Sequence, residues 1–152
     1  MANINESGSN DPFDLSRFVQ AQARDYDQAL AEIRAGRKRS HWIWYIFPQF
    51  AGLGFSTMSQ RYAIGSVDEA RAYLAHPVLG HRLVECAEAA VGVERRSALE
   101  IFGSPDDMKV RSSATLFARV SPPGSVFERL LERYFPAGPD ARTLELTGAA
   151  ER

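Results

Sequence analysis

The chain has very little cysteine or histidine. Among its 152 residues there is one cysteine, Cys86, and there are three histidines, His41, His76 and His81. One cysteine cannot form an internal disulfide, and low cysteine usage is typical of a reducing compartment. The histidines show neither an H-E-x-x-H motif nor four-residue helical spacing, so they form no recognisable zinc pattern. We therefore predict no metal site and no cofactor, and a cytoplasmic location.

Long apolar runs are also missing. No stretch reaches the 18 or more apolar residues that a membrane span needs, and the first residues, MANINESGSNDPFD, lack the basic and apolar parts of a secretory signal. Hydrophobic residues make up 45% of the chain and charged residues 24%, as in globular proteins. We predict a disordered tail over residues 1–12, one domain over residues 13–146, a second tail over residues 147–152, and no membrane contact.

Hairpin signals are absent, because no Asn-Gly or Asp-Gly pair separates alternating apolar runs. Apolar residues instead recur every three or four positions, and Ser or Asp precedes several of these segments as a helix cap. We predict an all-α fold, a single compact multihelical domain of about seven helices with short connections. The expected helices begin near residues 15, 66, 77, 97, 105, 125 and 140. We expect Asp14 to cap the first helix and Gly36 to end it.

Residues 41–47 are ambiguous between helix and strand. Their aromatic and branched side chains favour a strand, but the chain offers no partner strand. We prefer a short buried helix that is capped by Ser40 and ends before Pro48.

Acidic residues are missing from residues 33–67. That window has a local charge of +5, while the whole chain has a net charge of −1. A positive field of this kind attracts anions over about 10 Å. The window also contains Gly52-Leu53-Gly54-Phe55-Ser56, whose glycines can expose backbone N–H groups to an anion. This loop is not a P-loop, because it has no second glycine that is followed by a lysine.

The window suggests a basic and aromatic ligand site. In this interpretation, basic side chains line a wall, aromatic rings provide a stacking surface, and an amide and a loop hydroxyl complete the site. The residues are Arg37, Lys38, His41, Trp42, Trp44, Tyr45, Gln49 and Ser56. Such a site suits a ligand that carries a ring and a phosphate, such as a nucleotide. The alternative is purely structural: basic residues follow a helix end and the aromatics fill the core.

Residues 105–117 are the second unusual stretch. Lys109 could neutralise an anion while Ser113 donates a hydrogen bond to it. Structurally, the hydroxyls of this stretch could instead bond back to the preceding helical turn. His41 is the best-placed base and Asp107 a possible acid partner, so His41, Asp107 and Lys109 are the candidate catalytic residues. Whether the protein is an enzyme stays open.

Two other functions remain open. Residues 34–39 could bind RNA weakly through their basic cluster, although the nearly neutral net charge makes a nucleic-acid partner less favourable. A protein-interaction module without catalysis would instead expose an apolar patch.

Several blocks resemble a bacterial family of unknown function whose members are sometimes mislabelled "calpastatin". They are ALAEIRAGRKRSHWIWYIFPQ with GLGFS, YLAHPVLGHRL, PDDMKVRSSATLF and YFPAGPDARTLELT. The resemblance extends from about Phe13 to Leu146, and Ala114 departs from it where a larger apolar residue is expected. It implies a small, mostly helical cytoplasmic protein and supplies no activity, ligand or catalytic residue.

Overall fold

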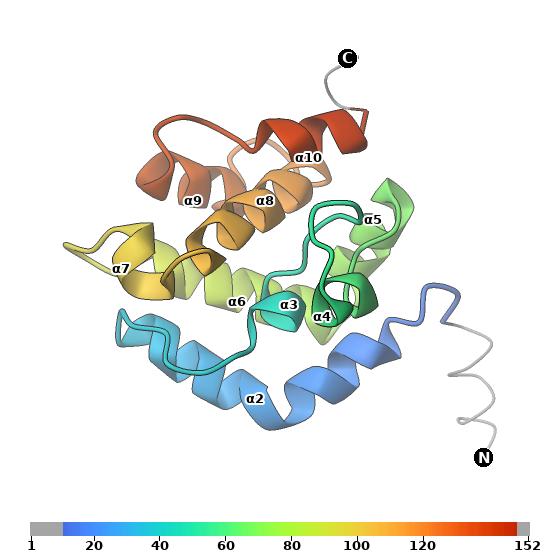
Figure 1. Ribbon diagram of the computed structural model, residues 1–152, viewed down its shortest axis with the longest axis horizontal. Coiled ribbons are helices and arrows are strands. Elements are labelled where there is room, and N and C mark those ends of the chain that lie inside the picture. The colour runs from blue at the N-terminus through green and yellow to red at the C-terminus, as the bar shows by residue number, and fades with distance from the viewer. Residues whose placement is uncertain (1–10, 149–152) are drawn as a thin grey trace.

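The structure is a computed structural model that describes residues 11–148. This part of the chain folds into nine α-helices (Figure 1). They are α2 (Ser16–Arg34), α3 (Ile43–Ile46), α4 (Thr57–Arg61), α5 (Val67–Ala75), α6 (Leu79–Val91), α7 (Ala98–Phe102), α8 (Asp106–Arg119), α9 (Val126–Tyr134) and α10 (Ala141–Leu146). Outside the helices, strand-like pairing within residues 11–148 is limited to one parallel bridge between Phe50 and Ile64. The predicted all-α fold is confirmed.

Helix starts agree with the sequence where a serine and a glutamate stand three residues apart. Ser97 and Glu100 form a complete capping box at α7, and the Ser66 hydroxyl accepts a hydrogen bond from the Glu69 N–H at α5. At α2 the predicted cap, Asp14, is wrong. The carboxylate of Asp11 accepts the first backbone N–H groups instead, so a residue that we assigned to the tail starts this helix.

At the end of α2 the chain reverses direction and continues toward the residues of the candidate site. Gly36 has a φ of 78°, a left-handed conformation that favours glycine, and its N–H donates to the carbonyl of Ile33. The N–H of Arg37 donates to the carbonyl of Glu32. This pair of bonds is a Schellman motif, which satisfies the last carbonyls of α2 and reverses the chain. The predicted stop at Gly36 is confirmed.

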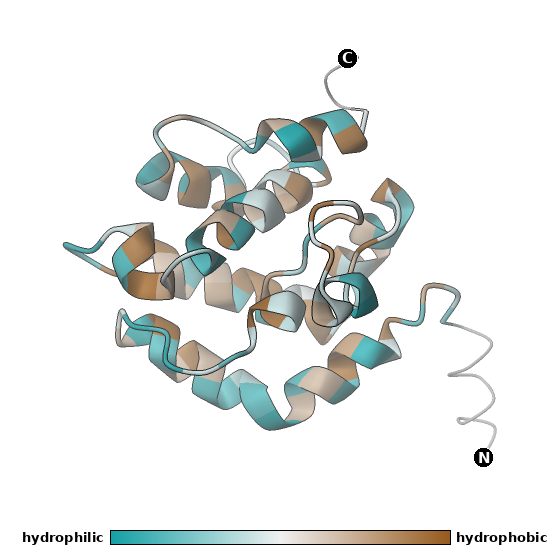
Figure 2. Ribbon diagram, viewed as in Figure 1, coloured by the Kyte–Doolittle hydropathy of each residue, from teal (hydrophilic) through white to brown (hydrophobic). Residues whose placement is uncertain are grey.

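The helices pack around a continuous aromatic core. Phe18 of α2 meets Tyr73 of α5, which meets Phe117 of α8, which meets Phe127 of α9, with ring centroids 5.0, 5.4 and 5.8 Å apart. Figure 1 shows α6 and α8 between α2 on one side and α9 and α10 on the other. Figure 2 shows hydrophilic and hydrophobic residues alternating along α2, as expected for a helix with one buried face. No helix within residues 11–148 combines the length and the apolar character that crossing a membrane requires.

Segment 41–47 is largely the short buried helix that we preferred. Its helix, α3, lies against both α2 and α8, and Ile43 and Ile46 are each 1% exposed. The predicted cap is wrong, because Trp42 occupies the N-cap position and makes no capping bond. α4 is an additional helix, which is capped by Ser56. α3 therefore places the aromatic segment directly beside α8.

Candidate functional site

Residues 39–42 wrap around one buried carboxylate. Glu32, which is 7% exposed, accepts hydrogen bonds from the N–H groups of Arg39 and Ser40 and from the Ser40 hydroxyl. It also accepts from the Trp42 indole N–H at 2.9 Å and from the Gln28 amide at 3.0 Å. Burial by itself raises the pKa of Glu32, but these hydrogen bonds outweigh burial and lower the pKa to about 2. Ser40 therefore binds Glu32 instead of capping α3.

Three predicted ligand contacts lie inside the protein. Trp42 is 1% exposed, Tyr45 is 6% exposed and Ser113 is 1% exposed. The Tyr45 hydroxyl donates to the Asp25 carboxylate, and burial together with that bond raises the pKa of the phenol. The Ser113 hydroxyl has no hydrogen-bond partner among residues 11–148. A ligand at the surface cannot reach these side chains, so we leave them out of the contact set.

Asp106 joins the two segments that the sequence singles out. Its carboxylate lies 2.8 Å from the ammonium of Lys38 and 3.5 Å from the ammonium of Lys109. Lys38 also donates to the carbonyl of Ser40, and its ammonium lies 5.0 Å from the ring centre of Trp42. The structure therefore brings the 36–56 and 105–117 segments together at this carboxylate.

Trp44 is the accessible aromatic surface of this region. It is half-buried, and the ammonium of Lys109 lies 5.6 Å from its ring centre. A cation at this distance is attracted by the negative face of an indole. Trp44 and Lys109 therefore place a flat ring beside a positive charge at the protein surface.

Among residues 11–148, none of the remaining predicted contacts forms a side-chain hydrogen bond with this pair. Arg37 and His41 are exposed, and Gln49 is half-buried with its backbone carbonyl bound to the N–H of Ile64. Ser56 is exposed, but its hydroxyl caps α4 by accepting from the N–H of Ser59. Ser56 therefore has a structural role in this conformation.

The candidate catalytic residues do not form a linked group. No hydrogen bond or ion pair in the described part of the chain connects His41 with Asp107 or Lys109. Asp107 lies one residue after Asp106, about 100° further around α8, and one of its carboxylate oxygens is buried without a partner. A catalytic role for these three residues therefore stays a prediction.

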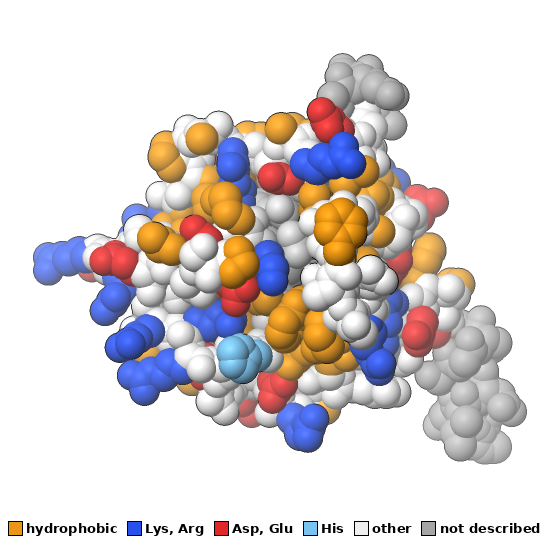
Figure 3. Space-filling model, viewed as in Figure 1, with side chains coloured by type: hydrophobic (Ala, Val, Ile, Leu, Met, Phe, Trp, Pro, Cys, Tyr) orange, Lys and Arg blue, Asp and Glu red, His pale blue; other side chains and the backbone are white. Residues whose placement is uncertain are grey.

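Acidic side chains from outside residues 33–67 lie close to this window and partly neutralise its positive charge. Glu32 precedes the acid-free window and folds back onto it, while Asp106 arrives from α8. Figure 3 shows several basic side chains toward the lower left of this face with a histidine inward of them, further basic side chains elsewhere on the face, and hydrophobic side chains beside a recess nearer its middle. Sequence reasoning missed Glu32. The available signal was an acidic residue in the last turn of a helix, where the helix dipole disfavours it.

Cys86 is not part of the candidate site. Cys86 is fully buried in α6, and burial raises the pKa of its thiol to about 12. We expect its alkylation by iodoacetamide at pH 8 to be about a thousandfold slower than that of an ordinary thiol, because so little thiolate is present. Mass spectrometry of the folded and the urea-unfolded protein measures this. Rapid labelling of the folded protein would contradict the prediction.

One family model and one solved structure each match most of the chain. A family model described as a protein of unknown function (DUF1810) matches residues 12–147. The conserved hypothetical protein Rv1873 from Mycobacterium tuberculosis, whose crystal structure is solved, is 52% identical to this chain with a TM-score of 0.88. The match covers 90% of this chain and 98% of that one. None of the curated proteins compared with the chain matches it.

Proposed function

The chain belongs to the DUF1810 family of proteins of unknown function, as its sequence blocks suggested, and because membership supplies no activity we propose one from the geometry. The protein binds a small anionic ligand with a planar ring, such as a nucleotide. The ring stacks on Trp44 and the anionic group binds Lys109. Arg37 contributes a positive charge, His41 an imidazole and Gln49 an amide.

The observation that supports this proposal is the unequal sharing of Asp106. Lys38 holds the carboxylate at 2.8 Å, whereas Lys109 lies 3.5 Å from it. An ammonium has three donors, so Lys109 can bind an anion while Asp106 stays with Lys38. The side chain of Lys109 is 23% exposed and that of Lys38 is 7% exposed. Of the two lysines, Lys109 is therefore the one that meets a ligand.

The RNA alternative has less support. A basic strip binds RNA by neutralising several phosphates in a row. Within the 34–39 cluster, Lys38 is turned inward and paired with Asp106, and Arg34 is paired with Glu85 at 3.6 Å. The exposed charges of Arg37 and Arg39 remain, which are few for a phosphate track. Salt dependence separates RNA binding from small-ligand binding, because the affinity for RNA, which depends on many phosphate contacts, falls steeply as the salt concentration rises.

The protein-interaction alternative has one favourable observation. Phe55 is 83% exposed in the loop before α4, and Met108 of α8 is 45% exposed. Exposed apolar side chains of this size are common at interaction surfaces. These are two single side chains from different elements, so we retain small-ligand binding as the first proposal.

Thermal shift with a panel of nucleotides and sugar phosphates tests the proposal. A ligand at about 100 times its Kd should stabilise the protein by about 2.7 kcal/mol. We expect Lys109→Ala to weaken binding about tenfold by removing a charge-assisted bond, and Trp44→Leu to weaken it similarly by removing the stacking surface.

The matched control is Arg142→Ala. Arg142 is exposed on α10 and pairs with Glu145, so its loss removes one positive charge without changing the site. Ligand affinity should stay within about twofold. Absence of any shift across the panel, or equal losses in the Lys109→Ala and Arg142→Ala variants, would count against a ligand site at Trp44.

A further inference from the structure

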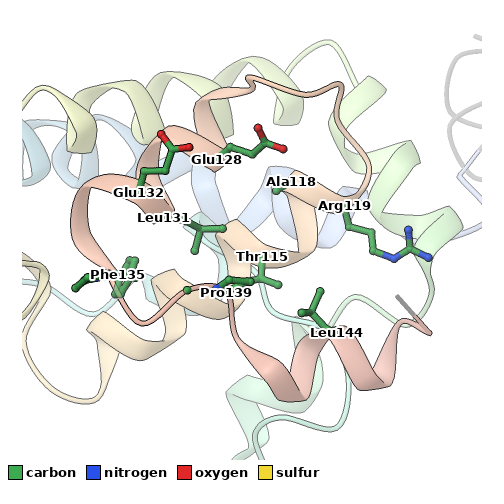
Figure 4. Close-up of a pocket in the computed structure, with 11 residues that line it drawn as sticks. Thr115, Ala118, Arg119, Glu128, Leu131, Glu132, Phe135, Pro139 and Leu144 are labelled. Carbon is green, nitrogen blue, oxygen red and sulfur yellow. The ribbon is translucent and has the colours of Figure 1, made fainter. Parts of the chain in front are cut away.

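A pocket lies on a different part of the molecule from Trp44 and Lys109. This pocket of about 550 Å³, open to solvent, is lined by α8, α9, the 135–140 loop and α10. Its interior is formed mainly by apolar side chains, among them Leu131, Phe135 and Leu144. Figure 4 shows Leu131 on α9 and Leu144 on α10 at different sides of this space. A volume of this size with apolar walls is typical of sites for small organic molecules.

Hydrogen bonds hold the wall of this pocket in place. Arg111 of α8 donates to the carbonyls of Gly138 and Pro139, at 2.8 and 3.2 Å. The hydroxyl of Thr115, which lines the pocket, accepts from the N–H of Asp140 at 2.9 Å. The backbone of the loop between α9 and α10 is therefore fixed by hydrogen bonds to two side chains of α8, and the pocket is formed before any ligand binds. Preorganisation lowers the entropic cost of binding.

The charged groups of the pocket are divided between its ends. Glu128 and Glu132 stand four residues apart on α9, and Figure 4 shows both carboxylates on one side while Arg119 extends from the other. Neither carboxylate forms an ion pair with a basic side chain of residues 11–148; Glu128 accepts only the N–H of Gly124. Like charges at this helical spacing repel each other. A cation at this end would relieve the repulsion.

We propose that this pocket binds a small organic amine, with an aromatic or aliphatic body against Leu131, Phe135 and Leu144 and an ammonium group beside Glu128 and Glu132. Arg119 disfavours the reverse orientation, because it would place two positive charges at the same end. The site is separate from the proposed anion site at Trp44 and prefers the opposite charge. Neither proposal depends on the other.

Tryptamine and indole-3-propionate are matched probes for this pocket, because they share a ring and a two-carbon linker and differ in the sign of the terminal charge. We expect titration calorimetry and amide chemical shifts to show tryptamine binding at least about tenfold more tightly, with shifts confined to α8, α9 and α10. Equal affinity of the two probes, or no saturable tryptamine binding up to millimolar concentration, overturns the proposal.

Two variants separate a specific site from general hydrophobic binding. Glu132→Gln replaces an exposed carboxylate at constant shape and should weaken tryptamine binding about threefold. Leu144→Lys places an ammonium at the pocket wall and should remove saturable binding, while circular dichroism confirms that the helices remain. Lys109→Ala should leave tryptamine affinity unchanged, because Lys109 is outside this pocket. Unchanged affinity in both pocket variants overturns the assignment.

Discussion

Glu32→Gln is expected to lower the free energy of unfolding by about 3 kcal/mol at pH 7. The fall in the pKa of Glu32 from 4.5 to about 2 corresponds to a preference of this order for the ionised carboxylate in the folded state. An amide cannot replace the carboxylate, since its NH2 group would face donors such as the Trp42 indole N–H and the Ser40 backbone. Chemical denaturation of both proteins measures the difference.

The same carboxylate predicts a pH dependence of defined sign. Because folding lowers the pKa of Glu32, its stabilisation is present above about pH 4.5 and is lost as the pH falls through about 2. The difference in stability between the wild type and Glu32→Gln should therefore narrow over that acid range. A difference that stays constant down to pH 2.5 would show that ionisation is not its source.

Gln28→Ala is the matched control for Glu32. Gln28 donates to the same carboxylate at 3.0 Å, but it is exposed to water. Its removal should cost no more than about 0.5 kcal/mol, because water replaces an exposed donor. If Gln28→Ala lowered the free energy of unfolding as much as Glu32→Gln does, the bonds of the carboxylate to the 39–42 segment would not be the source of the stabilisation. The residues around the carboxylate would be its source instead.

Gly80→Ala is expected to destabilise the protein by about 3 kcal/mol, opposite to the effect that helix propensity predicts. Gly80 lies in the first turn of α6, where alanine in place of glycine normally stabilises a helix by up to about 1 kcal/mol. A Cβ at this position would overlap the carbonyl oxygen of Leu74 in α5 and lie 2.9 Å from its carbonyl carbon. The backbone of Leu74 cannot move aside without separating α5 from α6, so the steric cost exceeds the gain in propensity.

Gly92→Ala is the corresponding control. Gly92 ends the same helix, and a Cβ there would lie 3.5 Å from the carbonyl oxygen of Glu88, which is ordinary contact. Its stability should equal that of the wild type or exceed it slightly. If Gly80→Ala and Gly92→Ala have equal melting temperatures, the close approach of α5 and α6 is not a constraint on residue 80.

Local signals in the sequence were sufficient for most helices. Serine caps marked the starts of α5, α7 and α9, and glycine at residue 36 marked the end of α2, because each signal acts on its own helical turn. The signals failed where the bonding partner was not the one expected. Asp11 replaced Asp14 at the start of α2, and α4 has too few residues to show a period.

The candidate site was only partly predictable, because its contacts join residues that are far apart in the chain. The sequence singled out Trp44 and Lys109 through their unusual neighbourhoods, and the fold places them together. It could not distinguish Trp44 from Trp42, which are two residues apart in similar surroundings. Exposure depends on which side of α3 faces the core, and this is decided by packing against α2 and α8.

The sequence by itself determined an all-α chain with most of its helix ends, because caps, turns and apolar spacing are interactions between near neighbours. Only the tertiary structure decided how charges and cavities are arranged. Asp106 reaches Lys38 because α8 packs beside the loop after α2, and the pocket at Leu144 exists because the 135–140 loop is bound to α8. Contacts between residues far apart in the chain depend on how whole helices pack, which no local pattern specifies.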